Sequence, residues 1–333
     1  MNFMNIASGA EVYLPGRGSR PGQVHVFDDD MIDGVDAALA AQRPLLVRGE
    51  PGIGKSQLAR AVAKHLGRVF VSFVVDARTE SSDLLWHYDA VARLADAQLA
   101  STFCSLGERP EQLRARLSVR NYLHPGPLWW AFDWEDAADQ AGTVRISEPP
   151  QQTDPEATLQ PDSKRGSVVL VDEIDKAESD VPNGLLEALG NGEFTPPGRA
   201  SPVVVRSGTP PPLVVITTNN ERALPDAFVR RCLVLRLELP DETPKALCDF
   251  LIARGQRHFP KVDVDKVLKP AAERLAEDRR KARENRQLPL PGQAEYLDLV
   301  RAVTTLESEP DRQGERLEKL ARYTFRKHPD APK

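Results

Sequence analysis

Short apolar runs alternate with amphipathic segments over the first two thirds of the chain. Five of these runs are rich in aliphatic and aromatic residues, as is typical of strands that are buried on both faces. They lie at residues 45–48, 68–75, 167–173, 213–219 and 232–239. Between them, apolar residues recur at helical spacing, most clearly over 57–66 and 180–190. Buried strands separated by helices predict an α/β fold built on a parallel sheet.

The pattern changes to helices alone after residue 240. Apolar stripes at helical spacing run over 246–253 and 296–306. We therefore predict a small all-helical domain over residues 241–333, which follows an α/β domain over residues 24–240.

Two segments lack periodicity. Residues 1–23 contain several glycines and prolines and are predicted to be a flexible leader. Residues 142–166 are rich in Pro, Gln, Asp, Thr and Ser, so they bury too little apolar surface to offset the entropy cost of ordering them. We expect this segment to be an exposed, mobile insertion that can be deleted without loss of the fold.

The most specific motif, G-x-x-x-x-G-K-S, stands between the first apolar run and the helix at 57–66. Its residues are Gly49, Glu50, Pro51, Gly52, Ile53, Gly54, Lys55 and Ser56, and Gln57 follows in the helix. Glycines let backbone N–H groups surround a phosphate chain, and the helix N-terminus adds a favourable dipole. Lys55 would contact the β/γ-phosphates of a bound triphosphate, and the Ser56 hydroxyl would bind Mg²⁺. The alternative is a turn that is only incidentally rich in glycine.

Polar residues end two further strands. Asp172 and Glu173 follow the run that begins at residue 167, and Asn219 ends the next run. Because ligands bind at the carboxyl ends of parallel strands, Asp172 would hold Mg²⁺ and Glu173 would activate the attacking water. Asn219 would bind the γ-phosphate or this water. The alternatives are that the two acids cap the next helix and that Asn219 starts a turn.

Two adjacent arginines, Arg230 and Arg231, precede the last strand of the predicted sheet. An arginine at the edge of a nucleotide-binding domain can reach the γ-phosphate bound by a neighbouring subunit and accelerate phosphoryl transfer. The alternative is a structural arginine that pairs with nearby acidic surface.

The composition of the chain bears on whether it binds nucleic acid or a membrane. A net charge of −5 argues against a whole-protein nucleic-acid footprint. Three tryptophans within 125–134 favour an aromatic core over a base-stacking platform, and five basic residues within 278–286 favour a solvated helix face over a nucleic-acid patch. The three cysteines form no C-x-x-C pair, and the chain shows neither a signal peptide nor an apolar run of about 18 residues. These features predict a soluble, cytoplasmic protein without membrane contact.

Segments 49–56, 169–173, 216–219 and 228–232, in this order and followed by helices, resemble an AAA+ ATPase. More narrowly, segments 79–85, 125–128, 172–177 and 192–194 resemble the MoxR-like branch. The resemblance implies a five-stranded core sheet of order 5-1-4-3-2 with a helical lid, and ATP hydrolysis with Mg²⁺. It also implies hexameric rings and a chaperone-like role in remodelling a client or adaptor protein, including partners with von Willebrand factor A domains.

The same resemblance assigns roles to individual residues. Lys55 and Ser56 belong to Walker A, and Asp172 and Glu173 to Walker B. Asn219 is the sensor-1 residue, and Arg231, ahead of Arg230, is the arginine finger.

The chain departs from the family at 291–296, where members often carry a sensor-2 arginine and this chain has none. Its insertion before the third strand is also long for the family. Two other functions remain open, a nucleotide-driven motor subunit of a nucleic-acid-directed restriction or defence complex and a nucleotide-controlled scaffold with negligible turnover. Stimulation of turnover by DNA would indicate the motor, and absence of turnover the scaffold.

Overall fold

The computed structural model describes residues 2–16, 21–105, 109–144, 150 and 161–325, without the side chains of residues 100–105. The chain divides into two compact units. Unit 1 consists of Met1–Val12, Val26–Arg48 and Ser56–Leu235, and unit 2 of Tyr13–His25, Gly49–Lys55 and Arg236–Lys333. Unit 2 thus includes two short segments from the first part of the chain, where the sequence predicts one boundary at residue 240.

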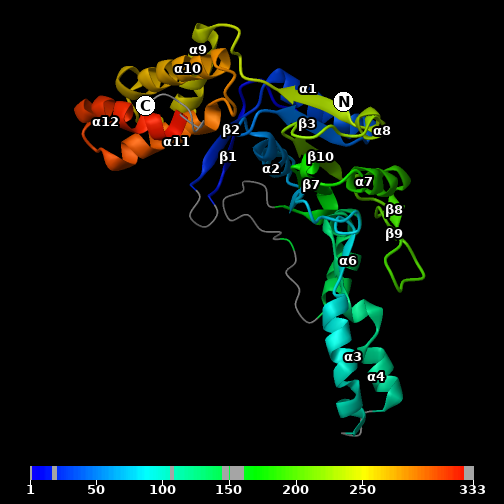
Figure 1. Ribbon diagram of the computed structural model, residues 1–333. Helices are drawn as coiled ribbons and strands as arrows, with labels where there is room; N and C mark the ends of the chain where they lie inside the picture. Colours follow the sequence, from blue (N-terminus) through cyan, green and yellow to red (C-terminus); the bar gives the residue numbers. More distant parts are fainter. Residues whose placement is uncertain (1, 17–20, 106–108, 145–149, 151–160, 326–333) are drawn as a thin grey trace. The chain divides into compact units, whose positions relative to one another are not determined.

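A five-stranded sheet forms the centre of the α/β fold (Figure 1). Its strands are β3 (Leu45–Gly49), β4 (Val69–Val74), β7 (Ser167–Asp172), β10 (Leu213–Thr218) and β11 (Leu233–Leu237). The spatial order is β11-β3-β10-β7-β4, and β10 pairs in parallel with both β3 and β7. Counted along the chain, this is the predicted order 5-1-4-3-2, which is confirmed.

Burial follows the position of each strand in the sheet. Every residue of the central β10 is buried, as are the first five residues of β7. The edge strand β4 is only partly covered, and Val74 at its end is 64% exposed. Strands covered on both faces need apolar side chains at every position. For this reason, the central strands correspond to continuous apolar runs in the sequence.

The first helix begins at a side-chain cap, and the second begins within the glycine-rich motif, two residues before the predicted segment 57–66. Asp28 caps α1 (Asp29–Ala41), and its carboxylate accepts a hydrogen bond from Met31 N. The helix α2 (Lys55–Leu66) starts within the glycine-rich motif. Further along the chain come α7 (Asp180–Asn191) and α8 (Asp226–Arg231). After α7, β8 (Glu193–Phe194) pairs antiparallel with β9 (Val203–Val204).

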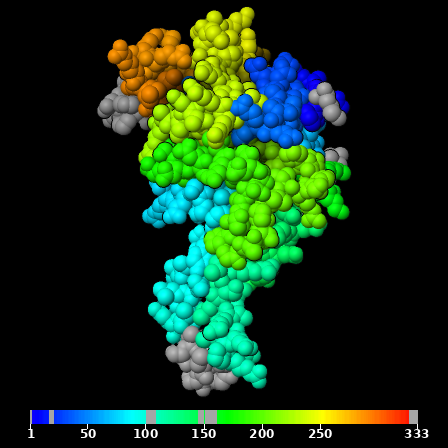
Figure 2. Space-filling model, turned by 90° about the vertical axis from the view of Figure 1, so that its right-hand side faces the viewer, coloured from blue at the N-terminus to red at the C-terminus, as the bar shows by residue number. Residues whose placement is uncertain are grey.

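A helical arm is inserted between β4 and β7. It starts and ends in the antiparallel pair β5 (Trp86–Tyr88) and β6 (Leu123–Pro125), and it contains α3 (Ala90–Ser105), α4 (Pro110–Arg116) and the 3₁₀ turn η1 (Val119–Tyr122). α3 and α4 lie side by side and extend away from the sheet (Figures 1 and 2).

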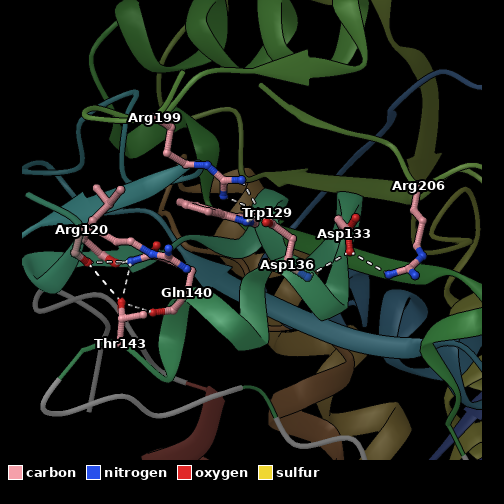
Figure 3. Close-up of polar contacts among 9 residues, drawn as sticks. Arg120, Trp129, Asp133, Asp136, Gln140, Thr143, Arg199 and Arg206 are labelled. Carbon is pink, nitrogen blue, oxygen red and sulfur yellow. Dashed lines mark hydrogen bonds and ion pairs between the residues drawn. The ribbon is translucent and has the colours of Figure 1, made fainter. Parts of the chain in front are cut away.

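The tryptophan-rich segment forms core helices, as predicted. α5 (Pro127–Phe132) packs against β4 and β7, and α6 (Trp134–Ala141) follows it. Trp129 is fully buried, and its indole N–H donates to Asp136 Oδ2 at 2.7 Å. Arg199, from the β8–β9 connection, forms two hydrogen bonds to Asp136 and lies over the Trp129 ring (Figure 3). Because the ring is covered, it offers no face for stacking a base.

The first residues of the chain differ from the predicted leader. Met4 is fully buried, and its N–H donates to Asp36 Oδ1 while its carbonyl contacts His65 Nε2 at 2.6 Å. β1 (Glu11–Leu14) and β2 (Gln23–Val26) then form a two-stranded sheet. Single apolar side chains that insert into a core leave no periodic signal, and sequence pattern alone therefore did not reveal this packing.

The predicted insertion at 142–166 lies mostly outside the described residues. Of its described part, Asp162 N donates to Gly67 O, and η2 (Ser163–Arg165) forms a short 3₁₀ turn before β7. The expectation that the segment can be removed stays a prediction.

Unit 2 is helical after residue 240. It contains α9 (Pro244–His258), the π-helical turn η4 (Val264–Leu268), α10 (Lys269–Glu284), α11 (Gln293–Leu306) and α12 (Pro310–Phe325). Four basic residues at the end of α10 form ion pairs within the unit. They are Arg279, Arg280, Lys281 and Arg283. The expectation of a solvated face is correct for three of them, but Arg279 is 3% exposed.

Candidate nucleotide-binding site

The phosphate-binding loop adopts a backbone that depends on glycine. Gly52 and Gly54 have φ angles of 77° and 103°, a region in which side chains are strained. A Cβ on Gly52 would also stand 2.6 Å from the Cβ of Ala294 in the first turn of α11. The backbone angle thus favours glycine at both positions, and the close approach of Ala294 is a second reason at Gly52.

The loop lysine is held by the loop itself. Lys55 is 7% exposed, and its Nζ donates to the carbonyl oxygens of Gly49 at 2.8 Å and Glu50 at 2.9 Å. The ammonium therefore lies inside the curve of the loop, where several backbone groups surround it. This position suits a cation that contacts the phosphates of a nucleotide. Pro51 and Gly52 are exposed, Ile53 is buried, and Gln57 is half-buried in the first turn of α2.

The acidic part of the site lies at the carboxyl ends of adjacent strands. Ser56 Oγ lies 2.8 Å from Asp172 Oδ1 and 2.9 Å from Asp172 Oδ2. Thr217, from β10, donates from Oγ1 to Asp172 Oδ1 at 2.5 Å and accepts from Glu173 N at 3.0 Å. The register explains this meeting, because Ile216 pairs with Val171 and places Thr217 beside the end of β7. Hydroxyl and carboxylate oxygens are the donors that Mg²⁺ prefers, so Ser56 and Asp172 fit this ion.

Glu173 directly follows β7 in a left-handed conformation, with φ 62° and ψ 45°. This conformation is uncommon for a residue with a side chain, and strained residues cluster at functional sites. The Glu173 carboxylate is half-buried and forms an ion pair with Lys176 Nζ at 2.5 Å. The same hydrogen bond raises the pKa of Lys176, which keeps this partner positively charged at neutral pH.

The remaining candidates lie in unit 1. Asn219 is half-buried and comes directly after β10, at the strand end that also carries Thr217. Arg230 and Arg231 end α8, and both are exposed. Their backbone carbonyls accept hydrogen bonds from Arg43, and among the described residues neither guanidinium forms an ion pair or a hydrogen bond. The alternative of a structural pairing for Arg231 therefore finds no support.

Sequence pattern missed two residues that contact the predicted acids. Thr217 is 1% exposed, and the only signal for its role was a pair of hydroxyl residues ending a fully buried strand. Lys176 lies three residues after Glu173, a spacing that brings side chains together in a helical turn.

A sheet of this order, with a glycine-rich loop after its first strand and an acidic pair after its third, defines the AAA+ P-loop class. The model of the AAA domain of the dynein-related subfamily matches residues 44–232, more than half of the chain. The chain therefore belongs to this AAA domain family, which is a family of AAA+ ATPases.

Solved structures with a similar fold include the RuvB Holliday junction branch migration motor of Thermotoga maritima. That structure has 16% sequence identity and a TM-score of 0.43, and the match covers 87% of this chain and 67% of that one. A point mutant of the same RuvB protein matches at 16% identity with a TM-score of 0.46, covering 87% of this chain and 68% of that one. Similarity at this level carries no conclusion about function. No curated protein matches the chain.

Among the described residues, no helix is long and apolar enough to cross a membrane.

Proposed function

We propose that this protein binds ATP with Mg²⁺ and hydrolyses it to ADP and phosphate. The observation that carries the proposal is the contact of Ser56 Oγ with both carboxylate oxygens of Asp172, at 2.8 and 2.9 Å, next to the phosphate-loop lysine in the chain. Hydroxyl and carboxylate groups in this arrangement are the protein's contribution to a metal site in P-loop ATPases.

Each residue has a distinct task in this proposal. Lys55 and the backbone N–H groups of residues 49–57 bind the phosphates, while Ser56 and Asp172 hold Mg²⁺. The ion supplies positive charge that polarises the transferred phosphoryl group. Thr217 fixes the rotamer of Asp172 through its 2.5 Å hydrogen bond.

Glu173 acts as the general base toward the attacking water, and Asn219 orients this water or the γ-phosphate. A carboxylate that accepts a proton must be free of competing cations. We therefore propose that Glu173 exchanges its pairing with Lys176 for the water when the enzyme is active. The ion pair is accessible to solvent, with the Lys176 side chain 41% exposed, so this exchange costs little.

The protein further acts, in our proposal, as a ring, for which a hexamer is the expected size, and it remodels a client or adaptor protein in the manner of MoxR-like ATPases. The exposed Arg231, with Arg230 as the less favoured choice, would reach the nucleotide of a neighbouring subunit. The client would include proteins with von Willebrand factor A domains. This finer assignment rests on the sequence resemblance described above.

Paired basic residues argue against the alternative of a nucleic-acid motor. Arg280 and Lys281 pair with Glu284 and Glu277 on the same helix, and Trp129 is buried. These three residues are therefore engaged in contacts within the chain. Turnover that rises severalfold on addition of single- or double-stranded DNA would favour the motor.

Three variants test the proposal. Lys55→Ala should abolish binding of a fluorescent ATP analogue, whereas Glu173→Gln should bind it and lose turnover by about 10² or more. Lys64→Ala, in the last turn of the same helix, is the matched control and should leave both unchanged. Equal loss of binding in Lys55→Ala and Glu173→Gln would overturn the role of Glu173, and binding by Lys55→Ala would overturn the site. The proteins that co-purify with Glu173→Gln would identify the client.

A further inference from the structure

An acidic residue lies inside the proposed anion-binding loop. Glu50 is the second residue of the motif, and its carbonyl accepts a hydrogen bond from Lys55 Nζ. The Glu50 side chain is 44% exposed, so water weakens but does not remove the repulsion between its carboxylate and a polyphosphate. A cation beside Glu50 would offset this repulsion.

Arg279 supplies this cation from α10, at a separation of 229 positions in the chain. Its guanidinium donates to Glu50 Oε1 at 2.8 Å, to Asp241 Oδ2 at 2.9 Å and to the carbonyl of Pro291 at 2.9 Å. All four residues belong to unit 2. Each partner comes from a different segment, so one side chain ties the phosphate loop to three parts of the helical unit.

Arg279 is buried in this contact, whereas the Glu50 side chain is 44% exposed. The Arg279 side chain is 4% exposed, whereas that of Arg283, which also pairs with Asp241, is 55% exposed. Burial alone would lower the pKa of Arg279, but its hydrogen bonds to Glu50 and Asp241 outweigh this effect and raise the pKa. The Arg279 guanidinium is therefore permanently charged, and its two carboxylate partners hold it in one position beside the loop.

We propose that Arg279 is a positioning residue of the phosphate loop, which neutralises Glu50 and fixes its backbone so that the loop accepts nucleotide phosphates. This inference rests on the proposed nucleotide binding and adds a residue that no motif of the chain contains. Arg279 acts through Glu50, whose carbonyl holds Lys55. The close approach of Gly52 to Ala294 is a second contact that fixes the same loop from the helical unit.

The test is a thermodynamic cycle on the full-length protein, with mant-ADP as the fluorescent probe. Arg279→Met leaves Glu50 uncompensated and should weaken mant-ADP binding about tenfold or more, since each tenfold step in Kd corresponds to about 1.4 kcal/mol. Glu50→Gln removes the charge that needs compensation and should bind within about threefold of wild type. The double variant should therefore bind more tightly than Arg279→Met alone.

Arg283→Met is the matched control. Arg283 lies on the same helix as Arg279 and also donates to Asp241, but in the described part of the chain it forms no hydrogen bond with Glu50. It should leave the Kd unchanged. If Arg279→Met does not fold by circular dichroism, Arg279→Lys serves in its place, with an expected weakening of about threefold to tenfold.

The possible outcomes separate this inference from the proposed function. If wild-type protein fails to bind mant-ADP, the proposed function fails. If wild type binds and Arg279→Met or Arg279→Lys binds equally well, Arg279 only stabilises the helical unit and the inference is wrong. Loss of affinity in Glu50→Gln as large as in Arg279→Met, with no recovery in the double variant, would also overturn it.

Discussion

Replacing Thr217 by valine probes the acidic part of the site at a single oxygen atom. Thr217 is 1% exposed at the end of β10, and valine keeps its branched shape, so the core around it stays filled. The substitution removes two hydrogen bonds, the donation to Asp172 Oδ1 at 2.5 Å and the acceptance from Glu173 N at 3.0 Å. It therefore isolates polar contacts from packing.

The expected loss of stability follows from these two bonds. A hydrogen bond to a charged group contributes about 1.5–3 kcal/mol, and an unsatisfied buried donor costs about 1–3 kcal/mol. Asp172 and Glu173 are half-buried, so water replaces part of both interactions. The added methyl group returns about 1 kcal/mol of apolar burial. Together these effects give a net loss of about 2 kcal/mol in the free energy of unfolding of unit 1.

Tryptophan fluorescence measures this quantity in unit 1 alone. All four tryptophans, at positions 86, 129, 130 and 134, lie within the segment Ser56–Leu235. Urea unfolding followed by their emission should show a lower midpoint for Thr217→Val than for wild type. The same variant should need more Mg²⁺ for half-maximal turnover, because Asp172 loses the bond that fixes its rotamer.

Thr218→Val is the matched control. Thr218 is also 1% exposed, but its hydroxyl accepts a hydrogen bond from Asn220 N, which is exposed and can bond to water instead. We expect a loss of about 0.5–1 kcal/mol there. A Thr217→Val protein as stable as wild type, or one that loses no more than Thr218→Val, would refute the reasoning about Asp172.

Two further predictions concern unit 2 and the ring. Burial and nearby positive charges lower the pKa of His25 to about 3 and that of His258 to about 4, so the unfolded chain binds more protons below pH 6.5. The charges facing these rings are those of Arg254 and Arg301, together with each other. Unit 2 should therefore lose stability as the pH falls from about 6.5 towards 4, measured by hydrogen exchange of its helices. His258→Gln should flatten the dependence, and an unchanged slope would contradict the assignment. If hydrolysis is shared between subunits, turnover per subunit should rise with protein concentration. A mixture of inactive Arg231→Ala with inactive Glu173→Gln should then regain activity, and normal turnover by Arg231→Ala alone would exclude a shared site.

The elements of the fold followed from local pattern because burial on both faces demands continuous apolar strands. The runs at 167–173 and 213–219 thus became β7 and β10 within one residue. The phosphate loop could also be predicted from the sequence, because its glycines, lysine and serine all lie within eight consecutive positions. The order of the strands in the sheet could not be predicted in this way, because the apolar pattern does not show which strands are neighbours. This order came from the resemblance to AAA+ proteins, which the observed sheet confirms.

Tertiary structure alone decided which distant side chains serve the site. Thr217 meets Asp172 because the parallel register of β10 and β7 brings the strand ends together. Arg279 stood in a basic helical stretch that predicted a solvated surface, yet it is buried against Glu50 of the phosphate loop. The spacing of apolar residues in a sequence predicts which face of a helix is buried. It does not predict which segment packs against that face, because this depends on contacts between residues far apart in the chain. For that reason the loop was determined by its own residues, and the groups that position it were determined by the fold.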